Sequence, residues 1–240
     1  MIPHLALLLV TDRRQAVRPL AEILEAAFAA GCRWASLREK DLSADEQIAL
    51  ARQLAPIAAK WSARLTLHGD AAVAAAARLD GVHLAGGSDA AMGRAKLATG
   101  ALLGISVHNV AEARALDPAI VDYAVAGPVY QTASKPGYGP ALGIEGLRAI
   151  VSAARVPIIA IGGIDALRVG ELRRAGAAGV AVMGSVMRAL DPAAEVRALL
   201  AALADAQSAF RLEGIGMRSR FLRWRISFSE NRHPLFRDMR

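Results

Sequence analysis

The chain has 240 residues, of which 54% are hydrophobic and 21% charged, so it is long enough for one large domain and too apolar to be disordered. A single cysteine (Cys32) excludes a disulfide scaffold, and the lack of a long apolar run or a signal-peptide pattern predicts a cytoplasmic protein outside the membrane. The net charge of +7 comes mostly from residues 211–240, where eight arginines face three acidic residues, so no basic stripe along the rest of the chain indicates nucleic-acid binding.

Residues 5–205 repeat one pattern, in which a short apolar run is followed by a polar or glycine turn and an alanine-rich amphipathic stretch. The apolar runs predict eight strands: Leu5–Val10, Trp34–Leu37, Leu65–Leu67, Val82–Leu84, Leu102–Ile105, Tyr123–Ala126, Pro157–Ile161 and Val180–Met183. The stretches between them predict helices that include Leu20–Ala30, Ala44–Ala59, Ala71–Leu79, Ala111–Leu116, Ile144–Ala154, Ala166–Ala175 and Ala193–Ala206. Ser43 and Glu46 have the spacing of a capping box at the start of the second helix.

Continuous apolar strands that alternate with helices indicate parallel strands buried on both faces. Eight such units favour an α/β fold of the (β/α)8 TIM-barrel type. A doubly wound sheet is also compatible with the periodicity, but Thr11–Arg14, after the first strand, lacks the glycine fingerprint of a dinucleotide-binding fold. We expect a barrel domain over residues 1–206 and a basic, poorly ordered extension over residues 207–240.

Residues 211–240 of the extension differ from the barrel in composition, because they have no alanine and hold three of the five phenylalanines of the chain. We interpret it as an appended segment. A basic-aromatic anchor for RNA or a membrane, suggested by Arg223-Trp224-Arg225, is the alternative from another functional class. Loss of all function on truncation after Ala206 would favour that alternative.

In TIM barrels the chemistry lies on the loops that follow the carboxyl ends of the strands. The last two such loops contain Gly162-Gly163 and Gly184-Ser185. Glycines let backbone amides approach an anion closely, and the following helix N-termini favour negative charge, so these loops predict a phosphate site. The simpler interpretation is that the glycines only form tight turns.

Three cations follow other strands and are expected at the same mouth: Arg38, Lys40 and Lys135. An arginine fork combined with mobile lysines suits a diphosphate. Lys135 lies in a stretch of hydroxyls and glycine, Thr132–Gly137, whose composition suits a loop that closes over an anion. The simpler interpretation is that each of these cations is an ordinary solvated surface residue.

Two of the five histidines, His68 and His108, end predicted strands and are expected to face the pocket. His83 lies within a strand, where a core role is the simpler interpretation, whereas His4 and His233 lie near the termini. The spacing of histidine, cysteine and aspartate does not support a zinc site.

The motifs in their order resemble the thiamine phosphate synthase/TenI superfamily, over residues 5 to about 205. The segments that carry the resemblance are Leu9–Arg13, Leu37–Asp41, Asp80–Leu84, Gly104–His108, Gly127–Tyr130, Thr132–Gly137, Ile161–Ile164 and Ala181–Ser185. The superfamily has a TIM-barrel fold, which agrees with the fold predicted from periodicity.

In the synthase branch, hydroxymethylpyrimidine diphosphate and a thiazole phosphate are joined to give thiamine phosphate and diphosphate, while Mg²⁺ and cationic residues hold the leaving group. The resemblance therefore implies small phosphorylated pyrimidine and thiazole substrates, with no nucleic-acid or membrane partner, and leaves a homo-oligomer open. By position it implies catalytic roles for Arg38, Lys40, Ser106, His108 and Lys135. It implies substrate-binding roles for Ser36, His68, Thr132, Ser134, Gly162, Gly163, Gly184 and Ser185.

The chain departs from the synthase pattern at its metal site. His68-Gly69 replaces the usual Asn-Asp, and Ser88 stands at the second metal-binding aspartate, so Asp70 and Asp89 remain as displaced candidates for Mg²⁺. Ser36 likewise replaces a usual glutamine. These departures suit the TenI branch, which isomerises a thiazole carboxylate phosphate without a metal and places its acid/base histidine at the position of His108. The cationic set favours the synthase; the tautomerase and a non-catalytic relative are the alternatives.

Overall fold

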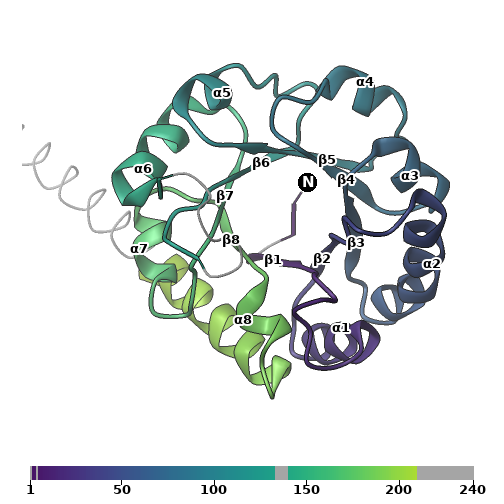
Figure 1. The fold of residues 1–240 in the computed structure, drawn as a ribbon. Coiled ribbons are helices and arrows are strands. Elements are labelled where there is room, and N and C mark those ends of the chain that lie inside the picture. The colour runs from purple at the N-terminus through teal and green to yellow at the C-terminus, as the bar shows by residue number, and fades with distance from the viewer. Residues whose placement is uncertain (1, 4, 133–139, 210–240) are drawn as a thin grey trace, which may run out of the picture.

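The computed structural model describes residues 2–3, 5–132 and 140–209. Eight parallel strands close into a barrel in chain order, and the helices surround it (Figure 1), which confirms the predicted (β/α)8 TIM barrel. The strands are Ala6–Val10 (β1), Trp34–Leu37 (β2), Arg64–His68 (β3), Gly81–Leu84 (β4), Leu102–Val107 (β5), Tyr123–Ala126 (β6), Ile158–Ile161 (β7) and Gly179–Val182 (β8). The helices are Leu20–Ala29 (α1), Ala44–Lys60 (α2), Ala71–Ala76 (α3), Ala90–Ala95 (α4), Val110–Arg114 (α5), Gly143–Ala153 (α6), Val169–Arg174 (α7) and Gly184–Met187 (α8).

The predicted strands agree with the observed ones to within two residues at each end. The capping box at α2 is confirmed, since the side chain of Ser43 accepts from the amide of Glu46 and the Glu46 carboxylate accepts from the amide of Ser43. The short helices α4 and α8 are absent from the predicted set, because a stretch of one or two turns has too few residues to show a helical period. In α4, Gly93 permits close packing, since a Cβ there would lie 2.9 Å from Cδ1 of Leu84.

Two apolar clusters hold the barrel together. The larger one lies between the strands and the surrounding helices, and the smaller one fills the barrel interior with side chains such as Leu8, Trp34 and Tyr123. The rings of Trp34 and Tyr123 pack edge to face with centroids 4.7 Å apart, and both are fully buried. The barrel interior around these rings is therefore a packed core and not an open channel.

A final helix occupies residues 192–209, and its buried Val196, Leu199 and Leu203 pack against the larger cluster. It continues a few residues past the expected domain boundary at residue 206. Residues 210–240, which make up most of the expected extension, lie outside the described residues. No helix in the described part of the chain is both long and apolar enough to cross a bilayer.

Candidate active site

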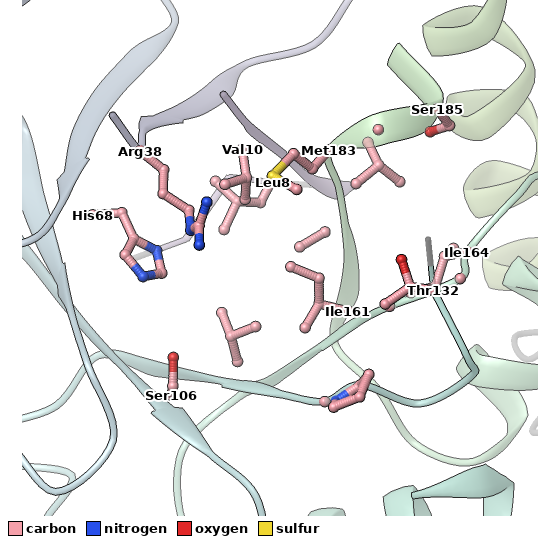
Figure 2. A pocket seen from close by; sticks show the side chains of 18 of the residues that line it. Leu8, Val10, Arg38, His68, Ser106, Thr132, Ile161, Ile164, Met183 and Ser185 are labelled. Carbon is pink, nitrogen blue, oxygen red and sulfur yellow. The ribbon is translucent and has the colours of Figure 1, made fainter. Parts of the chain in front are cut away.

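A pocket opens at the carboxyl ends of the strands, and it collects most of the residues predicted for the site (Figure 2). The predicted residues that line it are Arg38, His68, Ser106, His108, Thr132, Gly162, Gly163, Gly184 and Ser185. The predicted residues that are described but do not line it are Ser36, Lys40, Asp70 and Asp89. The predicted residues Ser134 and Lys135 lie outside the described residues.

The lining residues fall into two groups that face each other across the pocket. Figure 2 shows Arg38, His68 and Ser106 on one side, which we call the cationic end. Thr132 and Ser185 lie on the other side, and together with Gly162, Gly163 and Gly184 they form what we call the glycine end.

The loop after β7 requires its two glycines. Gly162 and Gly163 have φ angles of 103° and 64°, which L side chains rarely adopt. A Cβ on Gly163 would lie 2.6 Å from the carbonyl oxygen of Gln131, and one on Gly162 would lie 2.7 Å from Cα of Pro128. The glycines therefore form a tight turn, and they also keep the backbone bare where it lines the pocket.

Arg168 braces the same loop from outside the pocket. Its guanidinium donates to the carbonyl of Gly163 and lies over the ring of Tyr130, 4.5 Å from the centroid. The hydroxyl of Tyr130 donates to Glu171 at 2.9 Å, and burial together with this carboxylate raises the pKa of Tyr130 to about 12. The loop is thus anchored to α7, which limits its movement when a ligand binds.

The loop after β8 leads directly into α8, which begins at Gly184. A helix of a single turn has almost no macrodipole, so the expected dipole contribution is small here. The group that stands out is the hydroxyl of Ser185, which is buried and has no hydrogen-bond partner among the described residues. A buried hydroxyl without a partner is costly in the free protein, and a phosphate oxygen would satisfy it.

A network at the ends of β1 and β2 positions Arg38. The hydroxyl of Thr11 accepts from the amide of Arg38 at 3.0 Å and donates to the buried carboxylate of Glu39 at 2.6 Å. The other carboxylate oxygen of Glu39 accepts from the amide of Arg13, whose guanidinium donates to both oxygens of Asp41. These contacts join the segment after β1 to the segment after β2 and fix the loop that carries Arg38.

Two neighbours of Arg38 lie elsewhere than predicted. Ser36 is fully buried, its hydroxyl has no hydrogen-bond partner in the part of the chain that the structure describes, and it does not line the pocket. Lys40 is mostly exposed to solvent. Burial of part of its side chain, together with the positive charge of Arg38, lowers the pKa of its ammonium group. Strand alternation would place both on the face of Arg38, but β2 ends at Leu37, so the alternation does not extend to Lys40.

Ser106 and His108 reach the pocket from β5 and the loop after it. His108 is tied to α5, because its amide donates to Glu112 at 2.7 Å and its Nδ1 lies 3.3 Å from the same carboxylate oxygen. Gly86 lies against this segment, where a Cβ would be 3.0 Å from Cε1 of His108. The glycine after β4 therefore makes room for the His108 ring.

The two aspartates considered for magnesium are used as helix caps. Asp70 accepts from the amide of Ala72 at 2.6 Å at the start of α3, and Asp89 accepts from the amide of Met92 at 2.9 Å at the start of α4. Neither lines the pocket, and the described residues contain no group of three or more potential metal ligands. The donor set of the described residues does not fit a carboxylate-held Mg²⁺.

Sequence reasoning missed two polar residues of the pocket, Gln131 and Arg188, and gave His83 a core role although it also lines the cavity. The guanidinium of Arg188 folds back against Gly184, one helical turn earlier, and donates to the side chain of Gln15. Arg188 could have been identified from its spacing, because residues four apart lie on the same face of a helix and Gly184 was already a predicted site residue.

The charge of the pocket has one sign. Its described lining contains Arg38 and Arg188 together with three histidines, and it contains no aspartate or glutamate. Such a cavity favours anions at both ends, through Arg38 at one and through bare backbone, the hydroxyl of Ser185 and Arg188 at the other.

Comparison with known proteins gives one consistent family. A sequence profile described as thiamine monophosphate synthase matches residues 7–186. A protein of Geobacter sulfurreducens named putative thiamine-phosphate synthase is 41% identical over 200 residues, which is 82% of this chain and 94% of that protein. The thiamine-phosphate synthase of a Roseiflexus species is 38% identical over 201 residues, covering 82% and 84% of the two chains. The solved structure of thiamine phosphate pyrophosphorylase from Pyrococcus furiosus matches with a TM-score of 0.74 at 28% identity, covering 84% of this chain and 96% of that one.

Proposed function

Because the chain belongs to the thiamine monophosphate synthase family, we propose that it is a transferase that makes thiamine phosphate. Its substrates are hydroxymethylpyrimidine diphosphate and a thiazole phosphate, and its products are thiamine phosphate and diphosphate. The observation that supports this proposal best is the pocket with an anion-binding group at each end and no carboxylate in its described lining. Two substrates that each carry one phosphorylated group match a pocket with one anion-binding group at each end.

In this reaction the bond between the pyrimidine methylene carbon and the diphosphate oxygen breaks, and the electron pair leaves with the diphosphate. The thiazole nitrogen then donates its lone pair to the methylene carbon, which forms the new carbon–nitrogen bond. The protein need not transfer a proton in these steps. Its main task is to stabilise charge that develops on the departing oxygen, for which preorganised donors are most effective.

We assign the diphosphate to the cationic end. Arg38 offers a planar fork of donors, and the hydrogen bond of its backbone amide to Thr11 fixes the point on the pocket wall from which its side chain extends. Ser106 and His68 lie at the same end (Figure 2). Lys40, which is exposed near Arg38, and Lys135, which lies outside the described residues, stay in the proposal as further cations for the diphosphate.

We assign the thiazole phosphate to the glycine end. The bare backbone at Gly162 and Gly163, the start of α8 at Gly184 and the free hydroxyl of Ser185 all donate to phosphate oxygens in this assignment. Thr132 and Ser134 contact the same substrate. Arg188 adds a charge that folds over Gly184.

A second candidate function is the isomerisation of a thiazole carboxylate phosphate. The observation that favours it is His108 in the pocket lining, oriented by Glu112, in a cavity whose described lining has no carboxylate for a metal. In that reaction His108 would remove a proton from one ring position and return it to another. The two candidates share the glycine end and differ in what occupies the cationic end.

The test is a product assay with the purified full chain. We expect thiamine phosphate and diphosphate to appear in equal amounts when both substrates are supplied. Parallel reactions with and without added Mg²⁺ measure the metal requirement. Failure to form thiamine phosphate under either condition, combined with isomerisation of a thiazole carboxylate phosphate, would replace the synthase with the tautomerase.

A further inference from the structure

Four side-chain positions form one row across the barrel interior. The pairing of adjacent strands aligns His68 with His83, His83 with Gly104, and Gly104 with Tyr123, on β3 to β6. Gly104 has no side chain, and a Cβ there would overlap the ring of Tyr123. The glycine on β5 therefore lets the phenol of β6 reach across to the histidine of β4.

His83 is held from both ring nitrogens. Its Nε2 lies 2.9 Å from the hydroxyl of Ser106, and its Nδ1 lies 3.3 Å from the hydroxyl of Tyr123. The side chain is 2% exposed, and this burial lowers its pKa to about 3, so the ring is neutral at physiological pH. The ring of His68 packs on it with centroids 4.7 Å apart, and Tyr123 is the phenol on the opposite side.

A neutral imidazole has one N–H donor and one acceptor nitrogen, so the chain of three groups can run in two directions. If Ser106 donates to Nε2, Nδ1 must donate to the oxygen of Tyr123, and the buried phenol proton then needs another acceptor. Within the described residues, His83 is the hydrogen-bond partner found for this hydroxyl, and the neighbouring indole of Trp34 can only donate. That direction leaves a buried donor unsatisfied.

The opposite direction satisfies every group. Tyr123 donates to Nδ1, the proton of His83 is on Nε2 and is donated to the oxygen of Ser106, and the hydroxyl proton of Ser106 is left to point away from the histidine. Ser106 lines the pocket, so a ligand oxygen or solvent can accept that proton (Figure 2).

We propose that His83 and Tyr123 are positioning residues that fix the hydroxyl of Ser106 as a hydrogen-bond donor directed into the cationic end of the pocket. The proposal deepens the proposed function, on which it rests for the identity of the acceptor, a diphosphate oxygen. It also separates Ser106 from an activated serine nucleophile, because Nε2 carries a proton and cannot accept one from Ser106.

The direction of the hydrogen bonds between Tyr123, His83 and Ser106 can be measured by NMR of the full protein labelled with ¹⁵N at histidine. We expect the His83 ring to be neutral with the proton on Nε2, assigned by comparison with a His83→Gln variant. A proton on Nδ1, or a doubly protonated ring at neutral pH, overturns the proposal. This NMR measurement does not depend on whether the protein has enzymatic activity.

The functional consequence is measured with a double-mutant cycle of Tyr123→Phe and Ser106→Ala. We expect Tyr123→Phe to lower kcat/KM for thiamine phosphate synthesis about 3- to 10-fold in the wild-type background, the effect of one lost hydrogen bond. In the Ser106→Ala background we expect a change of less than about 2-fold, because the group that Tyr123 positions is absent. Equal losses in both backgrounds would mean that Tyr123 acts only on the fold, and would overturn the proposal.

Tyr130→Phe is the matched control, because it removes a phenol hydroxyl that is bonded to Glu171 and lies outside this row. Its effect should be the same in both backgrounds. A Ser106→Ala variant as active as the wild type overturns the proposal too, since the hydroxyl would then donate to nothing that matters. If the wild-type protein forms no thiamine phosphate, the proposed function fails, while the NMR result still decides the direction of the hydrogen bonds.

Discussion

At the glycine end of the pocket a ligand meets bare backbone, the hydroxyl of Ser185 and the guanidinium of Arg188, whereas at the cationic end it meets the side chains of Arg38, His68 and Ser106. The first end is built from turns whose backbone angles only glycine adopts easily. The second is built from side chains, of which His68 and Ser106 contact His83 and Arg38 is held at its backbone amide by Thr11. A phosphate that stays bound can be held by fixed backbone, while a group that departs gains most from donors already placed where its negative charge develops.

The largest effect is expected at the cationic end. Replacing Arg38 by alanine removes a donor that acts on the leaving group, so kcat/KM should fall on the order of 10²–10³-fold, or about 3–4 kcal/mol. Steady-state kinetics with both substrates measure it. Arg14→Ala is the matched control, since it removes an exposed positive charge that does not line the pocket. Equal losses in the two variants would indicate a general charge effect instead of a specific contact.

A smaller effect is expected at the glycine end. Ser185→Ala removes the buried, unpartnered hydroxyl, so binding of the thiazole phosphate should weaken about 10-fold while the melting temperature stays the same or rises slightly. Calorimetric titration and thermal unfolding measure the two quantities. Ser36→Ala is the control, because its hydroxyl is also buried and unpartnered but does not line the pocket. An affinity loss in Ser36→Ala as large as that in Ser185→Ala would argue against the assigned phosphate position.

His108 tests which reaction occupies the cationic end. In the synthase, His108→Asn should lower kcat less than about 10-fold, because the bond changes need no proton transfer by the protein. In a tautomerase the same change should cost roughly 10²–10⁴-fold, the usual contribution of a general acid/base. Rates measured with both substrate sets compare the two candidates. A loss confined to isomerisation would move the assignment to the second candidate.

The helix caps should affect stability and leave activity unchanged. Asp70→Ala and Asp89→Ala each remove an N-cap acceptor, which should lower the free energy of unfolding by about 0.5–2 kcal/mol. Because neither carboxylate lines the pocket, the dependence of the rate on Mg²⁺ should stay within about 2-fold of the wild type. A marked rise in the Mg²⁺ concentration needed for activity would restore these residues as metal ligands.

The smallest effect is expected from removing residues 210–240. The helix over residues 192–209 already packs Val196, Leu199 and Leu203 against the core, so a chain ended at Ala209 should melt within a few degrees of the full protein and keep its kcat. Thermal unfolding and the product assay measure both. A loss of all activity would favour the anchor interpretation of the basic segment.

Most of the fold could be predicted because each strand is a continuous apolar run between turn signals, as at Trp34–Leu37 and Tyr123–Ala126, where the predicted and observed bounds coincide. The loop glycines could be predicted as well, because a glycine pair directly after a barrel strand indicates a tight turn at the carboxyl end of that strand. Lys40 could not be placed, since its position depends on where β2 ends. The capping role of Asp70 could have been predicted, because an aspartate directly before an alanine-rich run is typical of a helix N-cap; Asp70 was instead interpreted as a metal ligand.

The role of His83 was beyond the sequence for a different reason. Its contacts depend on the register of β3, β4, β5 and β6 together, and a shift of one residue would turn Tyr123 away from it. A pattern within one strand carries no information on that register. Arg188 was missed for a similar reason, because its position follows from the single turn of α8.

The central claim is that the pocket holds two different anions at opposite ends. Direct binding of inorganic diphosphate and of the thiazole phosphate to the wild type, Arg38→Ala and Ser185→Ala tests it without any turnover. The account predicts that Arg38→Ala weakens diphosphate binding alone and that Ser185→Ala weakens thiazole phosphate binding alone. Equal weakening of both ligands by both variants would show a single shared anion site and contradict the account.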